Sequence, residues 1–153
     1  MSAAITVRPA ETADADVITD FNCRLADESE SKRLDPSTTL AGVLEVLANP
    51  MHGRYYVAEH DGRPVGQLLV TYEWSDWRNG RFWWIQSVYV MPAHRRRGVF
   101  RALYGHLDDL AAKSPDVCGL RLYVEAGNAP ARSTYAAIGM DETGYLVMEK
   151  AFR

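Results

Sequence analysis

One strand, turn and helix in the middle of the chain constrain its fold more than any other stretch. Residues 82–90 are rich in β-branched and aromatic side chains, which predicts a strand, and Pro92 ends its ladder pairing. A basic run and Gly98 follow, and a helix is predicted directly after them. The apolar positions of that helix recur at helical spacing: Val99, Ala102, Leu103, Leu107 and Leu110.

The start of this helix is predicted to be an anion site. First-turn N–H groups have no partner within a helix, and the helix dipole adds roughly half a positive charge beside them. Four basic side chains surround the turn: Arg95, Arg96, Arg97 and Arg101. A basic run is usually a solvated loop, but its position ahead of Gly98 and a helix favours diphosphate binding.

Composition favours one globular domain over residues 1–153. The chain is 47% hydrophobic and 24% charged, and its length suits a single core. A net charge of -3 argues against a general nucleic-acid binder, although a nucleic-acid phosphate contact through the basic run stays an alternative. Cys23 and Cys118 match no zinc pattern and are expected to be small buried side chains. No metal site is predicted.

Hydropathy predicts no membrane association. The chain has no apolar segment of transmembrane length, and no secretory signal is expected. The expected location is therefore cytoplasmic.

Turn residues divide the chain into strands and helices. Strands are predicted at 4–8, 54–60, 65–72, 82–90, 120–125 and within 140–152. Helices are predicted to begin near Glu11, Asp35, Gly98 and Asn128. Asp61 is followed by Gly62, which indicates a tight hairpin turn. This order predicts an α/β (α+β) domain whose mixed sheet has an antiparallel middle and helices on both faces.

Two motifs in this order resemble the GNAT superfamily of acyl-CoA-dependent N-acyltransferases. The first is a strand with Val88 and Val90 followed by Arg95-Arg96-Arg97-Gly98-Val99-Phe100, similar to the family's Arg/Gln-x-x-Gly-x-Gly/Ala. The second consists of Leu122-Tyr123-Val124-Glu125, Asn128, Ala131, Tyr135, Gly139 and Met140. Phe100 stands where the family usually has Gly or Ala, so its side chain must turn away from the phosphates.

The resemblance covers nearly the whole chain and implies a fold. A GNAT-like N-acetyltransferase domain over residues 1–153 would have a mostly antiparallel sheet of six to seven strands. That sheet is splayed in its middle, with about four helices on its two faces. Dimers are common among relatives, so a homodimer is compatible with the resemblance.

The resemblance also implies acetyl-CoA as co-substrate, without a metal. The main chain from Arg95 to Arg101, including Val99 and Phe100, is expected to hold the pyrophosphate. The pantetheine amides are expected to pair along Val88, Tyr89 and Val90, because a strand edge freed from its ladder offers them main-chain partners.

Tyr135 is the expected general acid for the departing CoA thiolate, since the family has an equivalent tyrosine before Gly139. A phenol is protonated at neutral pH and suits this role. The alternative is that Tyr135 is a core residue. Asn128 shares a helix face with Tyr135 and is expected to contact CoA, although capping the helix explains it as well.

The base that deprotonates the amine is less clearly marked. Some relatives use a glutamate on the central strand, but Gln86 is not a useful base. Glu73 is the expected base, directly or through water, and Glu28 is a second candidate. No Cys or Ser arrangement indicates a covalent intermediate.

The acceptor is expected to contact an aromatic and acidic wall. Its residues are Glu28, Tyr72, Trp74 and Trp83, beside Glu73. Trp83 and Trp84 are adjacent in a strand and so point to opposite faces, and a structural or dimer role for the tryptophans is equally compatible. The sequence thus predicts acetyl transfer to a small-molecule or peptide amine, without nucleic acid. The alternative is a non-catalytic acyl-CoA-binding or sensing domain of the same fold.

Overall fold

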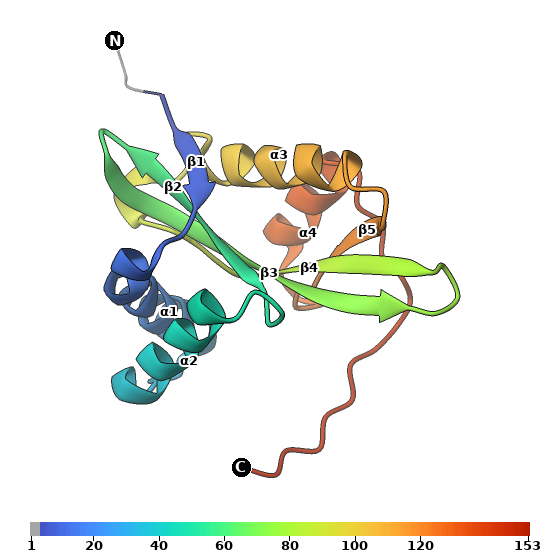
Figure 1. The fold of residues 1–153 in the computed structure, drawn as a ribbon, viewed down its shortest axis with the longest axis horizontal. Helices are drawn as coiled ribbons and strands as arrows, with labels where there is room; N and C mark the ends of the chain where they lie inside the picture. The colour runs from blue at the N-terminus through green and yellow to red at the C-terminus, as the bar shows by residue number, and fades with distance from the viewer. Residues whose placement is uncertain (1–3) are drawn as a thin grey trace. The chain divides into compact units, whose positions relative to one another are not determined.

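The structure, a computed structural model, describes residues 4–153, which form two compact units that divide after Leu122. In the described residues, the first unit contains a sheet and the helices α1, α2 and α3, and the second contains α4 (Ala129–Ala137) (Figure 1). Whether 1–153 behaves as a single domain stays a prediction.

The sheet of the first unit has five strands in chain order. They are β1 (Thr6–Pro9), β2 (Arg54–His60), β3 (Arg63–Ser75), β4 (Gly80–Val90) and β5 (Val117–Leu122). Neighbouring strands are antiparallel from β1 to β4, and β5 is parallel to β4. The β2–β3 turn has Asp61 at φ 52° and Gly62 at φ 72°, the left-handed pair that the Asp-Gly signal predicts.

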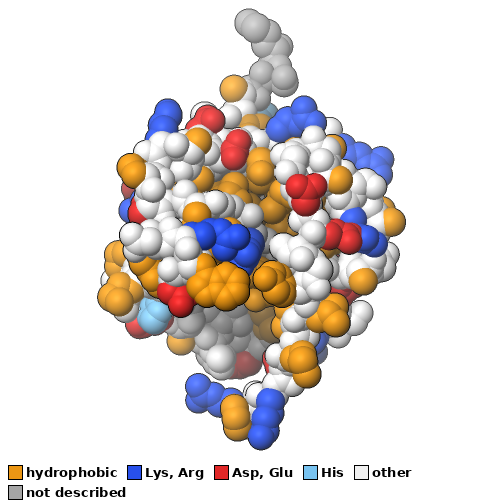
Figure 2. Space-filling model, turned by 90° about the vertical axis from the view of Figure 1, so that its right-hand side faces the viewer, with side chains coloured by type: hydrophobic (Ala, Val, Ile, Leu, Met, Phe, Trp, Pro, Cys, Tyr) orange, Lys and Arg blue, Asp and Glu red, His pale blue; other side chains and the backbone are white. Residues whose placement is uncertain are grey.

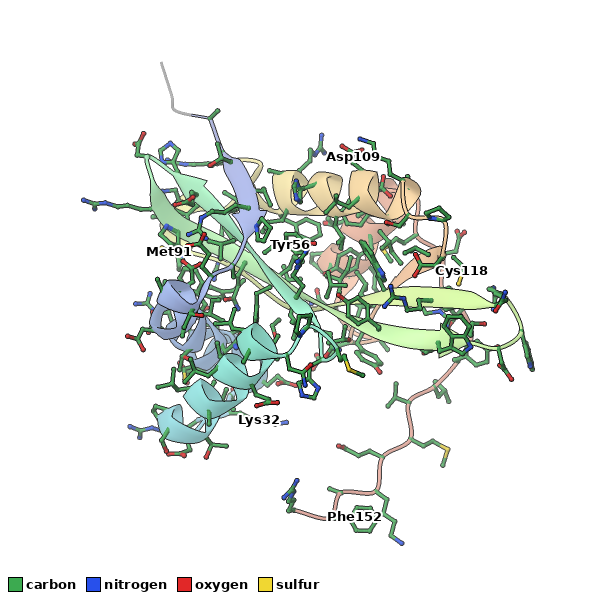
Figure 3. The ribbon with its side chains drawn as sticks, in the orientation of Figure 1. Lys32, Tyr56, Met91, Asp109, Cys118 and Phe152 are labelled. Atoms are coloured by element: carbon green, nitrogen blue, oxygen red, sulfur yellow. The ribbon has the colours of Figure 1, made fainter. Side chains whose placement is uncertain are left out.

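Helices cover both faces of this sheet (Figure 1). α1 (Ala15–Glu30) and α2 (Pro36–Ala48) pack on one face, where Ile18 and Val43 meet Leu69. α3 (Val99–Ala112) packs on the other, where Leu103 meets Leu68. Tyr56 lies between the sheet and α3, and its ring is 5.4 Å from that of His106 (Figure 3).

Local capping explains where the first two helices begin. Asp35 accepts a hydrogen bond from the Thr38 N–H at 3.0 Å, and Pro36 is the first residue of α2, as the sequence predicts. Glu11 and Asp14 form a capping box around the 3₁₀ turn Thr12–Asp14, which leads directly into α1. The Asp14 carboxylate is also held by Arg8 of β1 at 2.8 Å, which ties the helix start to the sheet edge.

The mixed, mostly antiparallel sheet and the four helices are confirmed, but the prediction of six to seven strands is wrong. Residues 140–152, where a last strand is expected, form neither strand nor helix in the described chain. A β-prone run such as 145–148 becomes a strand only with a ladder partner, and sequence pattern alone does not supply one. Cys118 is exposed on β5 rather than buried (Figure 3).

Candidate active site

A bulge interrupts β4 shortly before its end. Gln67 of β3 faces Tyr89, whereas Leu69, two residues further, faces Gln86. Two β4 residues, Ser87 and Val88, therefore lie opposite one β3 residue. Ser87 has φ 51°, the left-handed region that a serine in a strand seldom adopts.

The bulge changes which side chains face each helix layer. Before it, Ile85 packs in the core beneath α3. After it, Val88 and Val90 pack on that same core, although regular alternation from Ile85 would turn them away. Tyr89 turns instead to α1, where its ring lies 5.3 Å from that of Phe21.

Beyond the bulge, one edge of β4 is open within the first unit. β5 pairs with β4 only as far as Ile85, which faces Leu122. In that unit, the main-chain groups of residues 86–90 on the β5 side therefore have no ladder partner. A linear ligand with amide groups can pair with such an edge.

A pocket of about 210 Å³ adjoins the end of this edge. Its lining residues are Val90, His94, Arg95, Arg96, Gly98, Val99, Phe100 and Arg101. The pocket thus gathers most of the residues that the sequence predicts for the pyrophosphate, while Arg97 is outside the lining.

Backbone conformation shapes the turn that leads into α3. Gly98 has φ 83° and Arg96 φ 62°, so two left-handed residues bend the chain before the helix. Gly98 is the N-cap of α3 and provides no side-chain cap, so the first-turn N–H groups are left for another acceptor. The Phe100 ring lies 6.1 Å from that of Tyr104, one turn further along α3.

The Arg95 side chain makes hydrogen bonds to other residues of the chain. Its Nε donates to the Val90 carbonyl at 2.9 Å and its Nη2 to Glu28 at 3.1 Å. The guanidinium also lies 5.5 Å from the Tyr89 ring centroid. Burial and the neighbouring Glu28 carboxylate raise the pKa of the Tyr89 phenol. Glu28 of α1 therefore lies beside the basic turn.

Glu73 is held by two donors on one face of the sheet. The Trp84 indole N–H donates to its Oε1 and Arg121 to its Oε2, each at 3.1 Å. Arg121 in turn lies over the Phe82 ring, 3.6 Å from its centroid. The carboxylate is thereby oriented, and its side chain keeps 43% of its surface exposed.

The wall that the sequence predicts is divided between the two faces of the sheet. Tyr72 and Trp83 pack together, with ring centroids 6.4 Å apart, against the core beneath α3. Glu73 lies between Tyr72 and Trp74 in sequence and so points to the opposite face. Trp84, rather than Trp83, is the tryptophan that contacts Glu73.

Exposed aromatic side chains remain on the β3–β4 hairpin. Trp74 is 58% exposed and Trp77 87% exposed. Figure 2, which views the side of the molecule where this hairpin ends, shows hydrophobic and basic side chains next to one another.

The two remaining predicted site residues lie in the second unit, Asn128 just before α4 and Tyr135 within it. Asn128 accepts a hydrogen bond from the Ala131 N–H at 3.2 Å, so it caps the helix as its alternative role requires. Tyr135 follows Ala131 by one turn on the same helix. Burial raises the pKa of the Tyr135 phenol above its ordinary value of 10.0.

Sequence reasoning missed a polar network beneath the bulge. Gln67 is fully buried and donates to Asn22 at 2.7 Å and to the Ser87 carbonyl at 3.1 Å. Asn22 donates to the Tyr55 hydroxyl at 3.1 Å. The one signal is a glutamine within the otherwise apolar run 65–70, which indicates a buried polar group but not its partners.

The described residues, 4–153, contain no group of three His, Cys, Asp or Glu side chains placed to hold a metal ion. None of their helices combines the length and apolar character needed to cross a membrane.

Residues 20–140 match the model of the acetyltransferase (GNAT) family. The chain belongs to this family. Its fold is similar to that of a possible acetyltransferase from Clostridium difficile 630, at 41% identity and a TM-score of 0.92, covering 97% of this chain and 98% of that one. The family resemblance carried by the two motifs is therefore confirmed.

More distant GNAT-like structures share the fold. A predicted acetyltransferase with acetyl-CoA from Clostridium acetobutylicum has 18% identity and a TM-score of 0.79, covering 96% of both chains. AAC(6')-Iy, in complex with a bisubstrate analog of CoA and acetylneamine, has 16% identity and a TM-score of 0.76, covering 97% of this chain and 99% of that one. A comparison with curated proteins found no match.

Proposed function

We propose that this GNAT protein is an N-acetyltransferase that moves the acetyl group of acetyl-CoA to a primary amine by direct attack in a ternary complex. The observation that carries the proposal is the open β4 edge after the bulge, which leads to a pocket at the start of α3. An elongated ligand with amides at one end and a diphosphate at the other matches these two features together.

The residues present fit coenzyme A. The first-turn N–H groups of α3 and the arginines around them, Arg96, Arg97 and Arg101, would meet the diphosphate. The main chain of residues 88–90 would pair with the pantetheine amides. The acetyl-CoA of the Clostridium acetobutylicum protein and the CoA analog of AAC(6')-Iy support the same class of co-substrate.

The proposed reaction forms one bond and breaks one. The amine nitrogen attacks the thioester carbonyl, the C–N bond forms, and the C–S bond breaks to release CoA thiolate. Tyr135 is the proposed donor of a proton to that thiolate, because a phenol is protonated at neutral pH and can donate its hydroxyl proton. A main-chain N–H near Tyr89 or Val90 would stabilise the oxyanion. Asn128 is proposed to contact CoA besides capping α4.

Glu73 is the proposed acceptor of the amine proton, directly or through water. Trp84 and Arg121 orient the carboxylate, and each of its oxygens keeps a further lone pair for that proton. Glu28 remains a proposed contact of the amine substrate, because its carboxylate lies beside the basic turn, paired with Arg95. Tyr72 and Trp83 pack on the face of the sheet opposite to Glu73. Trp84 therefore replaces them as the proposed aromatic contact of the acceptor amine.

A small-molecule or peptide amine is the proposed acceptor class, and the acetylneamine part of the AAC(6')-Iy analog supports it. The cytoplasmic location and a homodimer stay predictions.

The test is thiol release by the purified protein with acetyl-CoA across a library of amines. The proposal predicts amine-dependent thiol release with at least one amine, together with a rise in Tm on adding acetyl-CoA. A rise in Tm without thiol release from any amine would favour the sensing domain instead. If acetyl-CoA causes neither thiol release nor a rise in Tm, that result would contradict CoA binding itself.

A further inference from the structure

Gln67 lies at the centre of β3 with its whole side chain buried. Its strand neighbours Val65, Leu68 and Val70 belong to the core beneath α3. Gln67 contacts Asn22 of α1, so its side chain points to the other face of the sheet. An amide at this depth must find partners for its polar atoms.

The contacts of Gln67 decide how its amide is oriented. Nε2 lies 2.7 Å from Asn22 Oδ1 and 3.1 Å from the Ser87 carbonyl, and both of these oxygens accept. Asn22 is itself oriented because its Nδ2 donates to Tyr55. Among residues 4–153, Gln67 Oε1 has no hydrogen-bond partner. Such an unpaired buried oxygen destabilises a fold, so an aliphatic side chain would suit a purely structural role better.

The Ser87 carbonyl belongs to the bulge residue that shifts the side chains of β4. Gln67 therefore binds the backbone at the point where the strand leaves its regular register. A second side chain binds the strand three residues later, because Arg95 donates to the Val90 carbonyl. Each of these donors is itself anchored on α1, Gln67 by Asn22 and Arg95 by Glu28.

We propose that Gln67, anchored by Asn22, is a positioning residue that holds the β4 bulge and thereby aims the main chain of residues 88–90 at acetyl-CoA. The inference rests on the proposed function, since it assigns these residues to the co-substrate. Gln67 is a buried side chain that acts through Ser87 and makes no contact with the reacting atoms.

The decisive pair of variants is Gln67→Met and Tyr55→Phe. Methionine keeps the length of the side chain but removes the donor to Ser87. Tyr55→Phe removes a hydrogen bond from the far end of the same network and leaves the Gln67–Ser87 contact intact. We expect Gln67→Met to weaken acetyl-CoA binding and lower kcat, each roughly tenfold, and Tyr55→Phe to change both by less than about twofold.

A second pair of variants, at Asn22, tests the same contact if Gln67→Met does not fold. Asn22→Asp keeps an acceptor for Gln67 and should retain most of the affinity for acetyl-CoA. Asn22→Leu removes that acceptor and should weaken binding as Gln67→Met does. Hydrogen exchange at the Tyr89 and Val90 amides, measured without ligand, should be faster in Gln67→Met and Asn22→Leu than in the wild type.

Two outcomes would overturn the inference. One is wild-type affinity and wild-type exchange at residues 89 and 90 in both Gln67→Met and Asn22→Leu. The other is an equal loss in Tyr55→Phe, which would mean that the network contributes only to core stability. If the wild type itself does not bind acetyl-CoA, the proposed function fails, and the exchange measurement still tests the hold on the bulge.

Discussion

The Trp84 indole N–H donates to Glu73 at 3.1 Å, across the β3–β4 ladder. The two residues are diagonal neighbours on one sheet face, because Glu73 faces Phe82 and Trp84 faces Thr71. Arg121 holds the second carboxylate oxygen from β5. Three strands therefore orient one carboxylate, which makes Glu73 the side chain to test first.

Replacing Glu73 with Gln should lower kcat for acetyl transfer roughly a hundredfold, because an amide accepts no proton but keeps the size of the side chain. The affinity for acetyl-CoA, measured by calorimetry, should stay within about twofold. Glu45→Gln, an exposed substitution on α2, is the matched control and should leave kcat unchanged. An unchanged kcat in Glu73→Gln would exclude Glu73 as the base.

Removing the hydroxyl in Tyr135→Phe should lower kcat by about a hundredfold and leave acetyl-CoA affinity within about threefold. The control is Tyr145→Phe in the same unit. Because burial raises the pKa of Tyr135, its phenol stays protonated to higher pH than an ordinary tyrosine. Any loss of kcat caused by its ionisation should therefore lie above about pH 10, and Tyr135→Phe should abolish it. Full turnover by Tyr135→Phe would show that another group protonates the thiolate.

Gly98 and Gly105 should respond in opposite ways to alanine. Gly98 has φ 83°, so alanine there should lower the free energy of unfolding by roughly 1 kcal/mol and weaken acetyl-CoA binding. Gly105 lies inside α3 with open space around it, so alanine there should raise the free energy of unfolding by about 0.5–1 kcal/mol. Urea denaturation measures both. Equal changes in the free energy of unfolding at the two positions would contradict the requirement for a left-handed backbone at Gly98.

The Arg8–Asp14 pair should make stability depend on pH. The hydrogen bond from Arg8 lowers the pKa of Asp14 below 3.8, its ordinary value. The pairing therefore stabilises the fold above that pH, and the stabilisation is lost as pH falls through the lowered pKa. Asp14→Asn should cost on the order of 1 kcal/mol at pH 7 and reduce the loss of stability below pH 4. Identical urea midpoints for variant and wild type across pH 3–7 would contradict this.

Local chemistry explains what the sequence predicts well. The Asp61-Gly62 turn and the Asp35 cap of α2 depend on residues adjacent in sequence, and both form as expected. The basic run and Gly98 likewise meet at a helix start because the turn and the helix are neighbours in the chain. Short-range patterns of this kind need no knowledge of the rest of the fold.

The bulge at Ser87 depends on residues far apart in sequence, which is why it escapes prediction. Its partners come from α1 and β3, and a serine within a strand carries no local signal for a left-handed φ. Alternation predicts that Trp83 and Trp84 separate, but which of them meets Glu73 depends on the β3–β4 register. The expected strand within 140–152 fails for a related reason, since a strand also requires a partner.

The most direct test of the central claim is to follow backbone amide resonances of the wild-type protein while acetyl-CoA is added. The account predicts saturable shifts of the amides of residues 88–90 and 98–101, with a common Kd at or below about 1 mM. Unchanged resonances at these positions up to millimolar acetyl-CoA, in folded protein, would contradict it.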